Sequence, residues 1–142
     1  MLLGLSGGPK SLDPQRLADD LAKEPLEGVR FRPVSFTPAW DKHKGQRCHG
    51  VQLHLTYARG LDAVGLGVAA VVHARAQDPG KFRWRTEKYE FVEDKPAIDL
   101  LTGSAAFRSM VEQGASVAQI RAAWEPERAA FARDRERFLL YA

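Results

Sequence analysis

Three of the four histidines and the single cysteine lie close together in the first half of the chain: His43, Cys48, His49 and His54. Thiolate and imidazole groups bind zinc, but the spacing here matches no familiar zinc pattern. A cysteine nucleophile assisted by a histidine would use the same residues, and closeness in sequence does not by itself create the required geometry. A buried or idle cysteine beside a glycine turn is the simpler interpretation of Cys48. We therefore predict no metal site, no cofactor and no catalytic residue here.

A predicted strand at residues 51–56 offers a second group of polar side chains. Its residues alternate between an apolar face and a polar face, and the polar face carries Gln52 and His54. Both side chains can hydrogen-bond to a ligand from one surface. A shallow polar sheet face without any ligand is the alternative interpretation.

The preceding predicted strand, residues 29–36, carries Arg32, whose forked guanidinium suits a carboxylate. The apolar residues change face across Pro33, which predicts a bulge or an edge strand. Arg30 shares the polar face only if Pro33 does not shift the strand register. Arg32 could equally be an ordinary surface arginine.

A long polar loop, residues 37–50, separates these two strands, and loops of this length are often functional. Trp40 lies in this loop and is the one tryptophan that we expect to contact a ligand. Trp84 and Trp124 are more typical of core or interface positions.

Helix signals surround these strands. A cap at Ser11 or Asp13 predicts a helix that ends near residues 25–28, and Asp62 predicts a second helix to about residue 76. Residues 82–85 and 89–92 predict a hairpin, because both are rich in aromatic side chains and a charged turn separates them. A short helical turn ending at Gly103 and a helix over residues 105–113 follow.

A capping box of Ser116 and Gln119 predicts a long last helix, kinked at Pro126. This helix is predicted to carry Val117, Ile120, Trp124, Phe131 and Phe138. Strands come early and helices late, which predicts an α+β fold with a small twisted, mainly antiparallel sheet packed against several helices. We expect residues 1–10 to be a flexible lead-in and residues 11–142 to form one domain.

Composition bounds the possible classes of protein. With 142 residues, of which 44% are hydrophobic, the chain is long enough for one sizeable core. The net charge of +3 arises from basic and acidic residues mixed along the chain, so it gives little support for a nucleic-acid partner. The chain shows neither a signal peptide nor an apolar run of membrane-spanning length. We expect a soluble protein, which is cytoplasmic if the chain is complete.

Four blocks carry a family resemblance: GVRFRPVSFTP, HKGQRCHGVQLHLT, YEFVEDKPAIDLLTGS and the last helix ending in FLLY. Together, over residues 29–141, they resemble the C-terminal half of the exo-β-N-acetylmuramidase family (NamZ-like, DUF1343). The resemblance implies a two-domain enzyme. Its N-terminal Rossmann-like domain carries the proposed catalytic carboxylate, and its smaller C-terminal domain closes a site for terminal N-acetylmuramic acid.

Two departures from the family limit what can be carried over. The residues before Ser11 hold no strand–helix repeats from which a Rossmann-like sheet could be built. The family also usually has an aspartate after the threonine at position 56, where this chain has Tyr57. Any role that rests on that aspartate is therefore lost.

The resemblance implies roles for several residues. Gln52 and His54 would contact sugar hydroxyls or the acetamide, and Arg32 would contact the lactyl carboxylate of muramic acid. Asp99 is similar to a family motif residue and would orient a neighbour at the site, or else it only braces the turn at Gly103.

A glycosidase also needs two facing carboxyl groups about 5 to 10 Å apart. The chain offers several acidic residues near its third block, but nothing in their pattern shows such facing: Glu90, Glu93, Asp94 and Asp99.

We therefore expect the sugar-binding, substrate-closing half of a peptidoglycan hydrolase, inactive by itself. Its partners would be a muramic-acid sugar and either a separate Rossmann-like catalytic chain or a homo-oligomer. The alternatives are a stand-alone binding or regulatory module for cell-wall fragments or a protein, and an incomplete piece of the enzyme. An enzyme half should expose an apolar docking surface, whereas a self-sufficient module should be monomeric.

Overall fold

The computed structural model describes residues 2–3, 12–40, 43–89 and 91–141. Its three strands form one antiparallel sheet in the order β1-β3-β2: β1 (Leu2–Leu3), β2 (Val29–Phe36) and β3 (Cys48–Leu55). The helices of the described part are α1 (Pro14–Ala22), α2 (Ala63–Gln77), α3 (Ala97–Thr102), α4 (Ala106–Glu112) and α5 (Val117–Glu136), with a 3-10 turn at Ala58–Gly60. The predicted α+β fold with a long C-terminal helix is confirmed.

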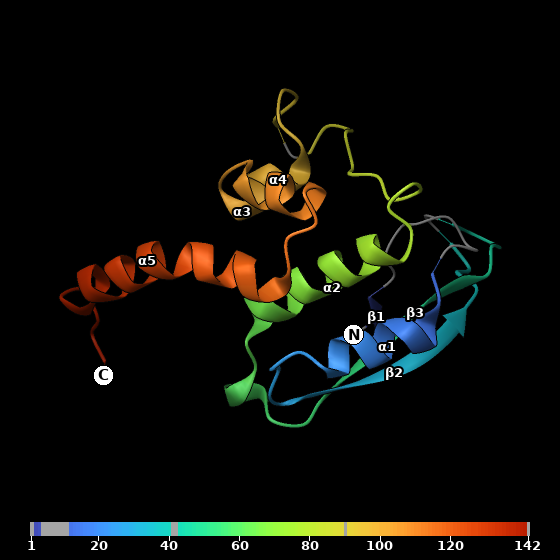
Figure 1. The fold of residues 1–142 in the computed structure, drawn as a ribbon, viewed down its shortest axis with the longest axis horizontal. Helices are drawn as coiled ribbons and strands as arrows, with labels where there is room; N and C mark the ends of the chain where they lie inside the picture. The colour runs from blue at the N-terminus through green and yellow to red at the C-terminus, as the bar shows by residue number, and fades with distance from the viewer. Residues whose placement is uncertain (1, 4–11, 41–42, 90, 142) are drawn as a thin grey trace.

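The elements are layered around α2. In Figure 1, α1 lies across the sheet, α2 lies between that layer and the α3–α4 pair, and α5 runs away from the other helices. One core joins α1, the inner face of the sheet, α2, α4 and the start of α5. Its largest members include Leu17, Leu21, Val51, Leu53, Leu66, Phe107 and Ile120.

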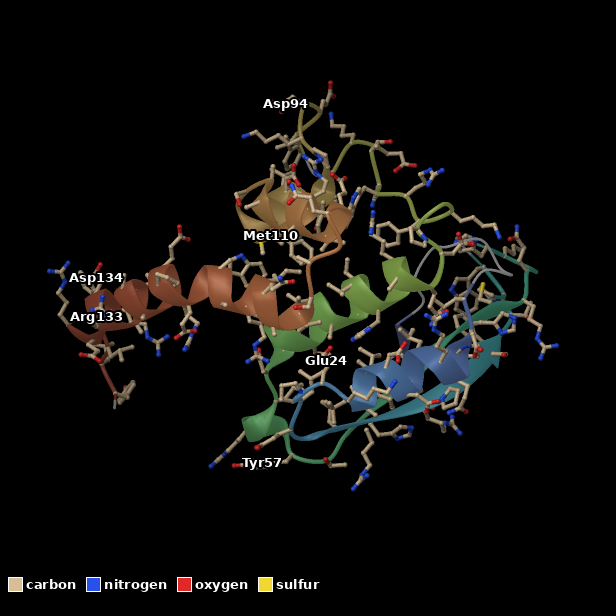
Figure 2. All side chains as sticks on the ribbon, viewed as in Figure 1. Glu24, Tyr57, Asp94, Met110, Arg133 and Asp134 are labelled. Atoms are coloured by element: carbon tan, nitrogen blue, oxygen red, sulfur yellow. The ribbon has the colours of Figure 1, made fainter. Side chains whose placement is uncertain are left out.

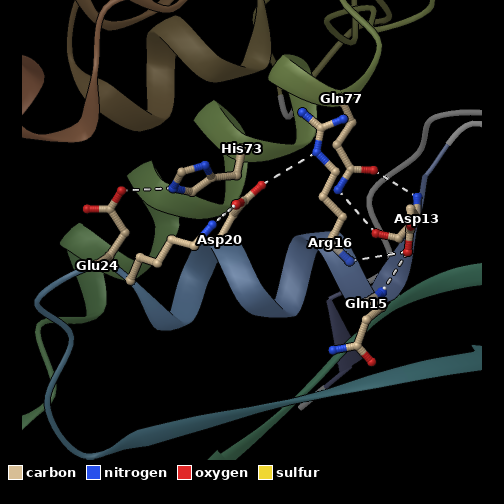
Figure 3. Close-up of polar contacts among 8 residues, drawn as sticks. Asp13, Gln15, Arg16, Asp20, Glu24, His73 and Gln77 are labelled. Atoms are coloured by element: carbon tan, nitrogen blue, oxygen red, sulfur yellow. Dashed lines mark hydrogen bonds and ion pairs between the residues drawn. The ribbon is translucent and has the colours of Figure 1, made fainter.

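Polar contacts hold α1 against α2 (Figure 3). Asp13 caps α1 by accepting hydrogen bonds from the backbone N–H groups of residues 15 and 16. The Asp13 backbone also exchanges two hydrogen bonds with the Gln77 side chain, at 2.8 and 3.1 Å. Beyond the other end of α1, Glu24 Oε1 lies 2.8 Å from His73 Nε2. These contacts keep α1 over the inner face of the sheet.

The pairing of β2 with β3 is unbroken. Every residue of β2 faces one residue of β3, from Val29 opposite Leu55 to Phe36 opposite Cys48. The predicted bulge at Pro33 is therefore wrong, whereas the edge position is confirmed by the strand order. An edge strand tolerates proline because the missing N–H can point away from its only neighbour. The change of apolar face across Pro33 reflects half-buried Val34 and Phe36 on the outer face.

Several expected boundaries and faces need correction. β3 begins at Cys48, so the loop between β2 and β3 covers residues 37–47 rather than 37–50. Leu55, expected on the buried face, is 59% exposed because it lies at the end of the sheet. Leu2–Leu3, expected in an irregular lead-in, pair with Val51 and Gln52. The rest of that predicted lead-in lies outside the described residues.

The hairpin predicted over residues 82–92 is wrong. The described residues of this segment contain a single bridge, between Tyr89 and Val92, and no ladder. Side chains anchor the segment instead: Trp84 donates to Glu112 at 2.9 Å and its ring lies edge-on to Phe107. Trp84, one of the aromatic residues that suggested a strand, therefore anchors the segment on α4.

Helix α5 begins at its predicted cap and is long, but it ends at Glu136, before Phe138, and only part of its apolar stripe is buried. The capping box of Ser116 and Gln119 is present, and the helix continues across Pro126, where the kink stays a prediction. Val117 and Ile120 are buried, whereas Phe131 and Phe138 are 66% and 72% exposed. These two phenylalanines are exposed because α5 extends beyond the other helices (Figure 1). Among the described helices, none combines the length and apolar character needed to cross a membrane.

Candidate functional site

The strand register gathers four polar side chains on the outer face of the sheet. Arg30 lies opposite His54, and Arg32 lies opposite Gln52. Residues directly opposite each other in antiparallel strands share a face, and so do residues two positions apart along one strand. All four side chains therefore project from the side away from Val51 and Leu53, which belong to the core. We call these four residues the polar patch.

One contact within the polar patch is formed already. Arg32 Nη2 donates a hydrogen bond to Gln52 Oε1 across the strands. Gln52 is half-buried, whereas Arg30, Arg32 and His54 are exposed. The amide N–H₂ of Gln52 stays available as a donor to a ligand.

The same outer face becomes apolar toward the loop. Half-buried Val34, Phe36 and Cys48 occupy it there, and Gly50 leaves a gap without a side chain beside Val34. The face thus joins hydrogen-bonding groups at one end to apolar groups at the other. This combination suits a sugar ring, which has polar edges and apolar C–H faces.

Trp40 lies in the loop that joins β2 to β3, which together form a β-hairpin, and 79% of its surface is exposed. The Arg30–His54 pair lies at the other end of the strands. Phe36 lies six positions after Arg30, which corresponds to about 20 Å along the strand. The strands therefore do not bring Trp40 beside His54.

Asp99 lies in α3, across α2 from the sheet (Figure 1). Its carboxylate accepts two hydrogen bonds from Arg108, from Nε at 2.9 Å and from Nη2 at 2.8 Å. These bonds hold the pKa of Asp99 below its ordinary value, and burial partly opposes that shift. The structure thus uses Asp99 to join α3 to α4 and keeps it apart from the polar patch.

The cysteine and histidines of the hairpin point in different directions. His49 lies on the inner face, where Nδ1 is 2.8 Å from Ser35 Oγ, whereas Cys48 and His54 lie on the outer face six residues apart. The described residues contain no group of three or more metal-binding side chains.

The segment that contains Glu93 and Asp94 lies apart from the sheet (Figure 1). Glu93 pairs with Lys88 at 2.6 Å. Asp94 lies across the molecule from Tyr57, which follows the end of β3 (Figure 2). Glu90 lies outside the described residues.

Sequence reasoning missed a groove between the start of α2, the α3–α4 pair and α5. It encloses about 770 Å³, and Leu101, Met110 and Trp124 are among its apolar lining residues. An ion pair between Arg121 and Asp62, 2.8 Å apart, lies in its wall. Four separate elements build the groove, so no local pattern in the sequence signals it.

Comparisons with known proteins match both the sequence and the fold of this chain. The family model described as exo-beta-N-acetylmuramidase NamZ, C-terminal, matches residues 3–141. The chain is 34% identical over 116 residues to the peptidoglycan beta-N-acetylmuramidase NamZ of Bacillus subtilis (strain 168). That match covers 82% of this chain and 26% of the relative.

A solved structure shares the fold. It is a DUF1343 family protein from Bacteroides fragilis NCTC 9343, similar with a TM-score of 0.72 and 23% identity. The match covers 92% of this chain and 33% of that protein. The chain thus spans about a quarter to a third of the length of these two proteins. By the extent of the family match and the identity to a curated relative, this chain belongs to the C-terminal domain family of the NamZ exo-β-N-acetylmuramidases.

Proposed function

We propose that this chain is the sugar-binding, substrate-closing domain of a peptidoglycan hydrolase that releases terminal N-acetylmuramic acid. The polar patch is the observation that carries this proposal. It presents exposed donors on a rigid two-stranded scaffold, beside an apolar area of the same face. Arg32, Gln52 and His54 contact the sugar in this proposal.

The chemistry is proposed to come from another domain. Across β2 and β3, all residues of which are described, the outer face carries no aspartate or glutamate. A glycosidase needs carboxyl groups on both sides of the scissile bond. The outer face can therefore hold an anionic sugar, but it lacks the acid and base for hydrolysis. Asp99 and Trp40 lie away from it, so their sugar contacts stay predictions that require a ligand reaching beyond the polar patch.

Exposed apolar side chains support a second polypeptide as partner. Phe131, Phe138, Leu140 and Tyr141 lie exposed at the far end of α5. Large apolar groups gathered at a surface commonly mark an interface. The curated relative is about four times the length of the matched region, which leaves ample chain for a catalytic domain.

An antiparallel second copy of this chain suits the end of α5 poorly. On the helix, Glu127 and Asp134 lie on one side of Phe131, and Arg128 and Arg135 lie on the other. Two antiparallel copies related by a two-fold axis would place each side against the same side of its partner. Acid would face acid and arginine would face arginine. Two parallel copies would place the acidic side of one helix against the arginine side of the other, so charge does not oppose that arrangement. We therefore propose a catalytic domain, rather than an antiparallel second copy, as the partner at this surface.

The proposal is tested by NMR titration of the labelled chain with N-acetylmuramic acid. We expect saturable amide shifts confined to residues 30–36 and 48–55. A β-muramide glycoside incubated with the chain should not be hydrolysed. Hydrolysis would contradict the assignment of the chemistry to another domain. A complete lack of shifts would contradict the sugar site and favour a module for a protein partner.

Two histidines of β3 form a matched pair of variants. His54→Ala removes a polar-patch donor, so we expect weaker binding of N-acetylmuramic acid by about threefold to tenfold, as for a single lost hydrogen bond. His49→Ala changes the same residue type on the same strand but on the inner face. It should leave the affinity unchanged. Equal effects of the two variants would show that binding does not use the outer face.

A further inference from the structure

The two arginines of the polar patch are not equivalent. Arg32 already donates to Gln52. Arg30 makes no ion pair or side-chain hydrogen bond with any residue in the described part of the chain, and it is exposed. The two Cα atoms lie two strand positions apart, about 7 Å. The guanidinium of Arg32 thus already has a partner, whereas that of Arg30 has none among the described residues.

A carboxylate is bound most tightly by two parallel N–H groups of one guanidinium. Arg32 already uses one N–H of Nη2 to bind Gln52, which restricts the directions from which its remaining N–H groups can meet a carboxylate. Arg30 can provide two parallel N–H groups without breaking any contact with the described residues. Its neighbour across the strands, His54, has a Cβ about 5 Å away and can donate to the same anion or to a hydroxyl beside it.

On this face of β2 and β3, no carboxylate competes with an anionic ligand for Arg30. The eight outer positions of β2 and β3 carry no carboxylate, and therefore none of them can neutralise the two guanidinium groups. An anionic ligand would meet uncompensated positive charge at the open end of the hairpin. The same charge offers no advantage to a neutral sugar.

We propose that Arg30, with His54 opposite it, binds the lactyl carboxylate and sets the preference for N-acetylmuramic acid over N-acetylglucosamine. Arg32, paired with the Gln52 amide, contacts the polar groups that both sugars share. This inference rests on the proposed function. Arg30 here takes the role of contacting the lactyl carboxylate, which the sequence pattern and the family resemblance gave to Arg32.

The test compares Arg30→Gln with Arg32→Gln, two exposed substitutions of the same type on one strand. Dissociation constants are measured by NMR for N-acetylmuramic acid, its methyl ester and N-acetylglucosamine. We expect Arg30→Gln to weaken N-acetylmuramic acid about tenfold or more, the loss expected for a charge-assisted pair, and to leave the two neutral sugars unchanged. Arg32→Gln should weaken all three sugars by a similar factor.

A third variant separates charge from geometry. Arg30→Lys keeps the charge but loses the fork, so it should restore only part of the preference for the acid. The inference is overturned if Arg32→Gln abolishes that preference while Arg30→Gln keeps it. It is also overturned if the intact chain binds the acid and its ester equally. If the intact chain binds none of the sugars, the proposed function itself fails.

Discussion

The pair of Asp99 and Arg108 gives a structural role to a residue that the sequence placed at the sugar site. Its two hydrogen bonds, at 2.8 and 2.9 Å, use both carboxylate oxygens and join α3 to α4. A bidentate pair of this kind is among the stronger polar contacts in proteins. The side chain of Asp99 is nearly buried, so water does little to screen the pair. We therefore assign Asp99 a role in stability.

Replacing Asp99 tests that role. Asp99→Asn should lower the free energy of unfolding by about 1–2 kcal/mol at neutral pH, because it removes a charge-assisted contact. Urea unfolding followed by circular dichroism measures this loss. The shifts induced by N-acetylmuramic acid on the polar patch should persist. Their disappearance in the folded variant would restore Asp99 to the sugar site.

The same variant should change how stability depends on pH. The pKa of Asp99 is lowered in the folded state from its ordinary value of 3.8, mainly by the hydrogen bond from Arg108. A lowered pKa stabilises the fold above the ordinary pKa, and that contribution is lost as the pH falls through the folded-state pKa. The difference in stability between the chain and Asp99→Asn should thus be constant near neutrality and shrink in acid. A difference that grows in acid would contradict this sign.

At the scale of elements, the hairpin depends on a close backbone contact at its open end. Gly28 has a φ of +73°, and its carbonyl accepts hydrogen bonds from the backbone N–H groups of Thr56 and Tyr57. A Cβ atom on Gly28 would collide with the backbone carbonyl of Tyr57. Only glycine therefore fits where β2 begins, directly beside Arg30 and His54.

Two glycine variants separate strain from collision. Gly45 has a φ of +72° but no atom near the position of a Cβ. We expect Gly45→Ala to cost about 1 kcal/mol, the usual penalty for a left-handed alanine, and Gly28→Ala to cost at least about 2 kcal/mol. Thermal unfolding measures both. Equal losses would mean that the approach of Tyr57 to Gly28 is looser than the structure indicates.

At the scale of the whole molecule, the apolar side of α5 is buried in the core near the start of the helix and exposed near its end. Ile120 is fully buried, whereas Phe131 on the same stripe is two-thirds exposed. Figure 2 shows Arg133 and Asp134 on the end of α5 that projects from the other helices. The groove beside Trp124 and Met110 continues this surface toward the α3–α4 pair. This arrangement fits a domain that completes its packing against another polypeptide.

Side-chain truncation should lower the free energy of unfolding more at the buried end of α5 than at its exposed end. Ile120→Ala should lower the free energy of unfolding by about 2–5 kcal/mol, because it opens a cavity in the core. Phe131→Ala should change it by no more than about 0.5 kcal/mol, as for most surface positions. Chemical denaturation of the isolated chain measures both. A large loss for Phe131→Ala would show that this side chain is covered within the chain itself.

Local patterns in the sequence determined most of the elements and the family. Helix caps such as Asp13 and the Ser116 box, and the alternation through residues 51–55, depend on neighbours a few positions apart. They could therefore be recognised in the sequence alone. The four blocks of the resemblance led to the family that the comparisons confirmed.

Contacts between distant segments decided the rest. Only the pairing of β2 with β3 showed that Pro33 leaves the register intact and that Arg30 joins Arg32 on one face. Only packing showed that Asp99 is held by Arg108 and that Phe131 lies beyond the core. One apolar stripe on α5 is buried in the core at Ile120 and exposed at Phe131. Periodicity states which side of an element is apolar, but the neighbour that covers that side comes from elsewhere in the chain or from another polypeptide.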